Sequence, residues 1–167
     1  ILDAIPEFVF VKGPKSRLLW ANKSFREYYG MSNEQLRGII DAPFNEPDYT
    51  AQYVRDDLKV FETGKIVEIP EEPVTRFDGQ VRLFHTVKSP IFDSKGDVVM
   101  SGGVSRDITD KKMADLVIEE QKARMVASSK MSSLGEMAAG VAHEINNPLA
   151  IIHGKASLLK AGARSGQ

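Results

Sequence analysis

The sequence predicts an α+β domain, in which one antiparallel sheet is flanked by short helices, followed by a long helix. Two strand-like segments, several short helical segments and three further strand-like segments follow one another up to residue 109. The composition then changes, because residues 110–130 contain neither glycine nor proline and mix acidic with basic side chains. We therefore expect an α+β domain over 1–109, a helical linker over 110–130 and a further helix over 131–167.

The domain is expected to begin with two strands and a capped helix. Apolar, aromatic and β-branched residues at 8–11 predict a strand that ends at a Gly-Pro turn, and residues 17–21 predict a second strand. Asn22 has the side chain that a helix N-cap prefers, and it precedes a helical segment at 23–29.

Two more helices are expected before the next strands. Ser32 and Gln35 have the spacing of a capping box, which predicts a short helix that ends near Gly38. A longer helix is expected from Thr50 to a stop at Gly64, after a loop or irregular stretch. Its apolar spacing predicts that one face is buried, formed by Val54, Leu58 and Phe61.

The second half of the domain alternates apolar and polar residues with a period of two, which predicts three antiparallel strands. They cover residues 66–75, 81–90 and 98–104, and an Asp-Gly turn joins the first two. Because Pro70 and Pro73 lack an N–H group, the first of these strands is expected at a sheet edge or at a bulge.

His85 is the one histidine within the predicted domain. It alternates with Val81, Leu83 and Val87, so we expect it on the apolar side of its strand. Two roles remain open for it: a contact with a pocket ligand or a pH sensor on the one hand, and a hydrogen-bonded core histidine on the other.

Residues 1–109 resemble a PAS domain. The resemblance is carried by the segment 19–25 (Leu-Trp-Ala-Asn-Lys-Ser-Phe), the hairpin 77–79 (Phe-Asp-Gly) and the exit segment 107–109 (Asp-Ile-Thr). It implies a dimerising sensor module, which in some members holds a haem, a flavin or a metabolite between the sheet and the helices. Neither haem nor photoactive flavin is supported, since the long helix has no histidine and the chain has no cysteine. The PAS ligand stays unknown.

A second pattern lies in the C-terminal helix. Met131, Leu134, Ala138, Val141 and Ile145 recur at steps of three and four, which predicts a helix with one buried seam. His143 is then expected opposite the seam, where water reaches its imidazole. Asn147 shares that face, and Glu144 lies about a third of a turn away. Pro148 is expected to bend the helix.

The run His143-Glu144-Ile145-Asn146-Asn147-Pro148-Leu149 resembles the phospho-acceptor box of sensor histidine kinases. The resemblance implies that His143 takes a phosphoryl group from ATP and gives it to an aspartate of a response regulator. It implies that Glu144 is the acid or base beside the ring and that Asn147 positions water for dephosphorylation. A zinc-protease motif is excluded, because Asn147 stands where a second histidine is needed. No metal site is expected.

The same resemblance indicates which further parts are expected in the longer protein to which this chain would belong, called the parent protein below. The dimerisation domain of that family is a helical hairpin, and only its first helix is present here. No segment resembles the family's ATP-binding domain, so we expect the fragment to be inactive alone, with ATP and that domain supplied by the parent. Two alternatives remain: a PAS binding module with a vestigial box, or a phosphorelay intermediate without its own kinase domain.

The linker 110–130 is expected to form a parallel two-chain coiled coil, so that the protein is a homodimer through both its PAS domain and this helix. Two seams compete in it. One passes through Val117, Glu120 and Arg124, and the other through Leu116 and Ala123, so that the register of the coiled coil remains open.

Composition limits the remaining functions. With 22 basic and 23 acidic residues the net charge is −1, which gives no electrostatic reason to expect nucleic acid or an anionic membrane as a partner. No apolar run reaches the ~18 residues of a membrane span. A cytoplasmic location fits the absence of cysteine. The chain begins with Ile1, as a piece of a longer protein would, and the parent remains free to carry a membrane anchor.

Overall fold

The computed structural model describes the backbone of residues 1–164 and the side chains of 1–138, 140–150 and 154. The last residues of the predicted helix 131–167 thus lie outside the described residues. The chain divides into two compact units, Ile1–Met113 and Ala114–Gln167, each of which is described by itself.

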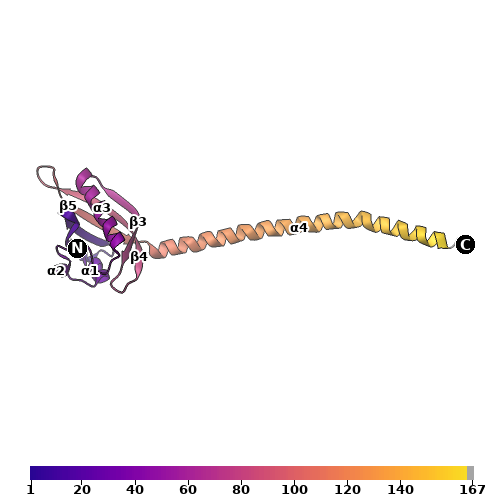
Figure 1. Ribbon diagram of the computed structural model, residues 1–167, viewed down its shortest axis with the longest axis horizontal. Coiled ribbons are helices and arrows are strands. Elements are labelled where there is room, and N and C mark those ends of the chain that lie inside the picture. Colours follow the sequence, from indigo (N-terminus) through magenta and orange to yellow (C-terminus); the bar gives the residue numbers. More distant parts are fainter. Residues whose placement is uncertain (165–167) are drawn as a thin grey trace. The chain divides into compact units, whose positions relative to one another are not determined.

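The first unit is built on an antiparallel five-stranded sheet with the strand order β2-β1-β5-β4-β3. The short helices and the longer α3 pack on this sheet, and α3 lies over it in Figure 1. The strands are β1 (Phe8–Gly13), β2 (Arg17–Ala21), β3 (Val67–Thr75), β4 (Val81–Phe92) and β5 (Val98–Asp107). The helices of this unit are η1 (Leu2–Ala4), η2 (Pro14–Ser16), α1 (Lys23–Tyr29), α2 (Asn33–Leu36) and α3 (Pro47–Thr63).

The two predicted helix caps are confirmed. Asn22 Oδ1 accepts hydrogen bonds from the backbone N–H groups of Phe25 and Val9, at 3.2 and 3.0 Å, so one buried side chain both caps α1 and ties it to β1. Ser32 and Gln35 form the complete capping box at the start of α2. Both helices thus begin where local side chains satisfy backbone donors that a helix start leaves free.

The edge position predicted from the two prolines is also confirmed. β3 is the outermost strand on its side of the sheet, and its register with β4 shifts between Ile69 and Glu72. The shift sets the neighbouring residues Glu71 and Glu72 apart: the first is exposed and the second is buried. A carboxylate is therefore directed to the inner side of the sheet.

The middle of the inner face is made by small residues. Ser101, Gly103 and Ser105 of β5 alternate inward, and Gly103 lies between Phe10 of β1 and Lys88 of β4. A Cβ atom on Gly103 would lie 2.2 Å from the Phe10 ring, so the glycine is required by the close approach of that ring. The small central strand leaves room between the sheet and α3.

The buried face of α3 differs from the prediction. The helix begins at Pro47, three residues earlier than expected, and it buries Tyr53, Asp57 and Val60. The predicted stripe was wrong, because Leu58 is 40% exposed and both Val54 and Phe61 are only partly buried. The apolar spacing predicted the wrong face because the face that is buried includes Asp57, a charged residue that such a pattern assigns to the surface.

The buried side of β4 was also predicted wrongly. Phe84, Thr86 and Lys88 face the helices, and the alternate residues, including His85, face the other side of the sheet. That outer side is itself apolar, so alternation of apolar residues marks it as clearly as the inner side. The inner side instead carries a lysine, which is 2% exposed and paired with a carboxylate.

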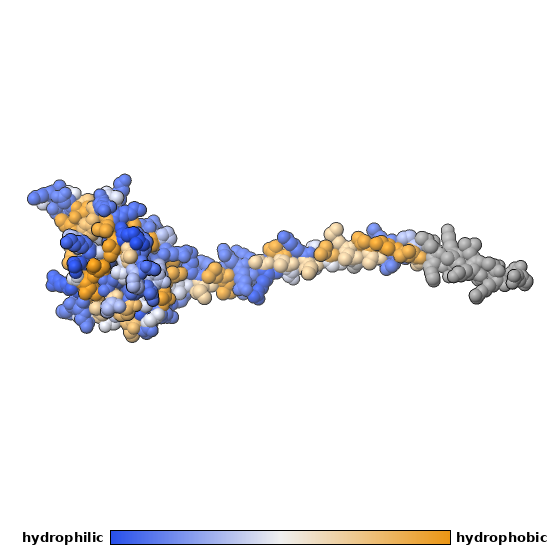
Figure 2. All heavy atoms as spheres, viewed as in Figure 1, coloured by the Kyte–Doolittle hydropathy of each residue, from blue (hydrophilic) through white to orange (hydrophobic). Residues whose placement is uncertain are grey.

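The described residues of the second unit belong to one helix. α4 spans Thr109–Arg164 and contains Pro148 in its interior, and its ribbon turns gently in the orange-yellow part in Figure 1. Apolar side chains are exposed along this unit, among them Leu134, Val141 and Ile145 (Figure 2). Among the helices that the structure describes, none combines the length and the apolar character needed to span a membrane.

Candidate functional site

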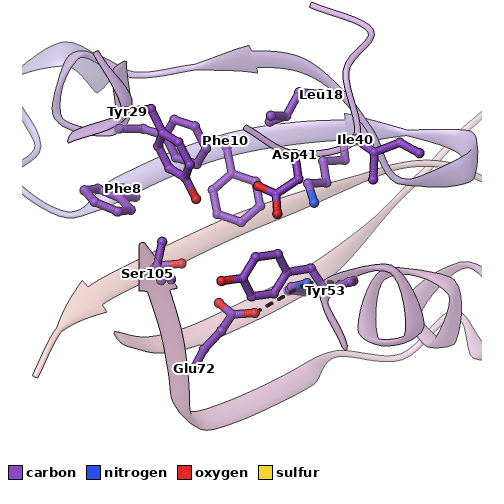
Figure 3. A pocket seen from close by; sticks show the side chains of 13 residues that line it. Phe8, Phe10, Leu18, Tyr29, Ile40, Asp41, Tyr53, Glu72 and Ser105 are labelled. Carbon is purple, nitrogen blue, oxygen red and sulfur yellow. Dashed lines mark hydrogen bonds and ion pairs between the residues drawn. The ribbon is translucent and has the colours of Figure 1, made fainter. Parts of the chain in front are cut away.

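A cavity lies between the inner face of the sheet and the helices of the first unit. The cavity has a volume of about 30 Å³, and the empty space that also takes in its open mouth is about 410 Å³. In Figure 3, Phe8, Phe10 and Tyr29 extend toward this space from one side, and Tyr53 and Glu72 extend toward it from the other. Aromatic rings therefore form much of the wall, with charged groups between them.

The two lysines of the wall, Lys12 and Lys88, are held by Asp57 of α3, which is 0% exposed. Its Oδ2 lies 2.8 Å from Lys12 Nζ and its Oδ1 lies 2.7 Å from Lys88 Nζ, and the Ser16 hydroxyl also donates to Oδ2. Burial alone would raise the pKa of Asp57, but the two ammonium groups outweigh it and lower that pKa. Asp57 is thus an ionised carboxylate that two buried lysines depend on.

A second carboxylate, Glu72 of β3, is only 5% exposed. Its Oε2 accepts a hydrogen bond from Thr86 Oγ1 at 2.5 Å, whereas its Oε1 lies 3.9 Å from Lys88 Nζ. Burial raises the pKa of Glu72, and the nearby Lys88 opposes the rise only in part. Among the residues that the structure describes, Glu72 Oε1 accepts no hydrogen bond.

The tyrosines at the cavity are anchored by the surrounding fold. Tyr53 donates its hydroxyl hydrogen to the Pro73 carbonyl, and the Tyr29 ring stacks on Phe25 with centroids 4.4 Å apart. Burial raises the pKa of both tyrosines, so both hydroxyls stay neutral. The rings therefore act as fixed, uncharged walls.

Sequence reasoning missed the residues of this cluster. Lys12 follows Phe8 and Phe10 at the next inward position of β1, and a strand that continues its buried side with a lysine is a signal that could have been noticed. His85, the predicted pocket candidate, does not line the cavity. Its side chain is 37% exposed and its Nε2 lies 2.8 Å from Glu68 Oε1 on the other side of the sheet.

The exit segment 107–109 ties the end of β5 to β4. The Ile108 N–H donates to the Leu83 carbonyl at 2.9 Å, and the Leu83 N–H donates to Thr109 Oγ1 at 2.9 Å. Arg82 pairs with Asp107 at 3.1 Å. The start of α4 is held as well, because Asp110 pairs with Arg82 and Lys112 pairs with Glu71 of β3.

The predicted phospho-acceptor residues lie on α4. His143, Glu144 and Asn147 are exposed. On a regular helix, residues four apart lie on one face, which places Asn147 on the side of His143, and Glu144 is about 100° away. Val141 and Ile145, the seam residues next to them, are exposed in the single chain at 53 and 54%. The helix thus offers both an imidazole and an apolar stripe that has no cover in one chain.

Comparison with known proteins agrees with this arrangement. Residues 2–113 match the PAS fold family. The chain belongs to the PAS-fold family. Residues 133–167 match the histidine kinase A phospho-acceptor domain, and this stretch includes His143, Glu144 and Asn147. The predicted pairing of a PAS domain with the phospho-acceptor helix of the sensor histidine kinases is confirmed.

Two curated relatives cover most of the chain. Sporulation kinase C of Bacillus subtilis is 27% identical over 165 residues, which are 96% of this chain and 37% of the relative. The C4-dicarboxylate transport sensor protein DctS of Rhodobacter capsulatus is 28% identical over 142 residues, 84% of this chain and 22% of the relative. The chain therefore spans 37% or less of the length of these two curated relatives.

A solved structure supports the fold of the first unit. The PAS domain of a protein from Colwellia psychrerythraea superposes with a TM-score of 0.57 at 22% identity, covering 65% of this chain and 92% of that domain. The predicted α+β PAS fold, with its antiparallel sheet and flanking helices followed by a long helix, is confirmed.

Proposed function

We propose that this chain is the sensory and phospho-acceptor part of a two-component sensor histidine kinase. The PAS cavity receives the signal, and His143 receives a phosphoryl group from ATP and passes it to an aspartate of a response regulator. The observation that carries the proposal is the exposed His143-Glu144-x-x-Asn147-Pro148 sequence, on a helix that matches the phospho-acceptor family and follows a PAS domain.

The residues fit the chemistry of the transfer. In its neutral form the His143 imidazole has one ring nitrogen with a free lone pair. That lone pair forms the N–P bond to the γ-phosphorus, while the bond to the bridging oxygen breaks and its electrons leave with ADP. Glu144 stabilises the charge that develops on the ring or takes its second proton. Asn147 orients the water that hydrolyses the phosphorylated regulator.

Dimerisation completes the site in this proposal. Leu134, Val141 and Ile145 are exposed in one chain, and a stripe of apolar residues at this spacing is covered when a second copy packs against it. His143, on the opposite side, stays accessible to an ATP-binding domain. That domain belongs to the parent protein, so the fragment alone does not phosphorylate itself. We place the reaction in the cytoplasm, where ATP is available.

The test uses the parent protein with its ATP-binding domain. After incubation with γ-labelled ATP, the proposal predicts a phosphate that is lost in acid and kept in base, as a phosphoramidate is. The label disappears in His143→Gln and persists in His85→Gln, which removes an imidazole of the PAS domain. If both variants keep the label, His143 is not the acceptor. If a folded parent that binds ATP stays unlabelled, the box is vestigial or is served by another kinase.

A further inference from the structure

Glu71 and Glu72 are neighbours in β3, and their side chains lie on opposite sides of the sheet. The first is exposed and the second is buried in the wall of the cavity. Between the pairs Ile69–Thr86 and Glu72–Phe84, β3 has one residue more than β4. The extra residue of such a bulge is not held by the ladder of hydrogen bonds, so this part of β3 shifts more easily than a regular strand.

Outside the cavity, Glu71 holds the first turn of α4. Its Oε1 pairs with Lys112 Nζ. This turn belongs to the same compact unit as the sheet, since that unit extends to Met113. β4 holds the same turn through the ion pair of Arg82 with Asp110. A shift of β3 at the bulge would therefore alter one of the two strand contacts at the start of α4.

Inside the cavity, Glu72 ends a row of polar side chains that crosses three strands. Thr86 Oγ1 of β4 lies 2.5 Å from Glu72 Oε2 and 2.8 Å from Ser105 Oγ of β5. The Thr86 hydroxyl has one hydrogen, so it donates to only one of these oxygens. If Glu72 is ionised, Ser105 donates to Thr86 and Thr86 donates to the carboxylate. If Glu72 is protonated, it donates to Thr86, which donates to Ser105. The same atom positions thus suit both states.

The other oxygen, Glu72 Oε1, lies in a position that favours the protonated state. Among the residues that the structure describes it accepts no hydrogen bond, and Lys88 Nζ is 3.9 Å away. Burying an anionic oxygen without a donor costs more free energy than burying the carbonyl oxygen of a neutral carboxyl group. Burial raises the pKa of Glu72, and Lys88 opposes the rise only in part.

The groups that face Glu72 from the other elements favour the same state. The titratable ones are Lys88 of β4, Lys12 of β1, Asp57 and Tyr53 of α3, Tyr29 of α1 and Asp41 of the segment before α3. β5 contributes Ser105, which does not titrate. Both tyrosines stay neutral, because burial raises the pKa of each. With Glu72 protonated, two ammonium groups face two carboxylates, and its ionisation adds a third carboxylate.

We propose that Glu72 is a proton-linked switch that controls the contact between β3 and the first turn of α4. While Glu72 is protonated, the bulge keeps Glu71 on Lys112. When Glu72 loses its proton to solvent, its carboxylate moves onto Lys88, and the gap of 3.9 Å closes to the ~2.8 Å of a charge-assisted hydrogen bond. The bulge follows this movement, and Glu71 withdraws from Lys112. The effect on His143 rests on the proposed function, whereas the switch itself does not.

A pH titration of the ¹⁵N-labelled chain tests the switch. The backbone amide of Thr86 reports on Glu72, and that of Lys112 reports on the contact with Glu71. We expect the two amides to share one titration step, with a midpoint above that of an unperturbed glutamate. Glu72→Gln, which keeps the neutral shape, should remove this step from both. Glu71→Gln should remove it from Lys112 and leave it at Thr86.

Hydrogen exchange measures the hold on α4 directly. The Lys112 N–H donates to the Ile108 carbonyl at 2.9 Å. Above the shared midpoint, it should exchange about two- to fivefold faster in the unchanged chain than in Glu72→Gln, the factor that an exposed ion pair supplies. Below the midpoint, the two should exchange alike. Glu68→Gln changes an exposed glutamate of the same strand, and it should behave as the unchanged chain does at both pH values.

Several results would overturn the switch. They are the absence of a titration step at Thr86, a step at Thr86 that Lys112 does not share, and a shared step that persists in Glu72→Gln. Equal exchange in the unchanged chain and in Glu72→Gln above the midpoint contradicts it as well. If Glu72→Gln does not fold, Glu71→Gln still decides, because the shared step must then be lost at Lys112 alone.

Failure of this inference and failure of the proposed function are distinguishable. The titration and the exchange use the chain without ATP and report only on the first unit. Labelling of His143 in the parent reports only on phosphotransfer. Labelled His143 with no shared step removes the switch alone, and a shared step with unlabelled His143 removes the kinase function alone.

Discussion

Replacing Asp57 by Asn should strongly destabilise the PAS domain. The carboxylate is 0% exposed and lies 2.7 and 2.8 Å from two buried ammonium groups, those of Lys88 and Lys12. The amide keeps the volume but removes the charge, so Lys12 is left buried without a counter-ion and Lys88 keeps only Glu72, whose Oε1 is 3.9 Å away. Breaking a buried ion pair in this way costs about 3–5 kcal/mol. Since domains are stable by about 5–15 kcal/mol, the loss is a large fraction of the total.

Thermal unfolding and urea denaturation, both followed by tryptophan fluorescence, measure this loss. Trp20 is the single tryptophan and lies in β2, so its signal reports on the PAS domain and not on α4. We expect the midpoint of thermal unfolding to fall by at least about 12 °C, at about 4 °C per kcal/mol. Asp56→Asn is the matched control, because Asp56 is only partly buried and, among the described residues, its carboxylate accepts hydrogen bonds from Gln52 alone. It should change stability by less than about 0.5 kcal/mol.

A rescue variant separates charge from packing. Asp57→Leu combined with Lys12→Met and Lys88→Met replaces the ionic cluster by apolar side chains, which is often neutral or stabilising. This triple variant should therefore recover most of the stability that Asp57→Asn loses. An Asp57→Asn domain within about 1 kcal/mol of the unchanged protein would refute the reasoning, since the lysines would then not depend on the carboxylate.

Substitutions of Glu72, Gly103 and Val141 test three further features of the molecule. Because burial raises the folded pKa of Glu72 above its unfolded value, its contribution to stability is present below pH 4.5 and is lost as pH rises through the folded pKa. Glu72→Gln should therefore gain stability relative to the unchanged protein at pH 8 and not at pH 4, in urea titrations at both pH values. Gly103→Ala should cost about 1–3 kcal/mol by the same assay, because its Cβ would lie 2.2 Å from an aromatic ring, whereas at Gly102 the nearest atom would be 3.6 Å away and the cost should be smaller. Val141→Lys, in the predicted seam, should weaken self-association in sedimentation equilibrium, and Glu136→Lys, on the opposite side, should not; equal effects would contradict the seam.

Much of the fold was readable because its determinants are local. The side chains of Asn22, Ser32 and Gln35 act on backbone groups within three residues, so their capping role depends on the near sequence alone. The turn and strand positions of the sheet follow from glycine, proline and β-branched residues in the same way. The phospho-acceptor motif is equally local, since it occupies two turns of one helix.

The residues of the cavity could not be predicted from neighbouring residues in the sequence. The cluster residues Lys12, Asp57, Glu72 and Lys88 come from three strands and one helix. Only Lys12, which continues the inward positions of Phe8 and Phe10, has sequence neighbours that indicate its burial. Apolar periodicity assigns charged residues to the surface, so it chose the wrong faces of α3 and β4 and placed His85 inside.

The sequence by itself determined the order of the elements, their caps, the PAS domain and the helix that presents His143, because each depends on neighbouring residues. The tertiary structure alone decided which face of β4 and of α3 is buried. It did so because a buried lysine is stable only beside a carboxylate, and that carboxylate, Asp57, lies 45 residues along the chain from Lys12.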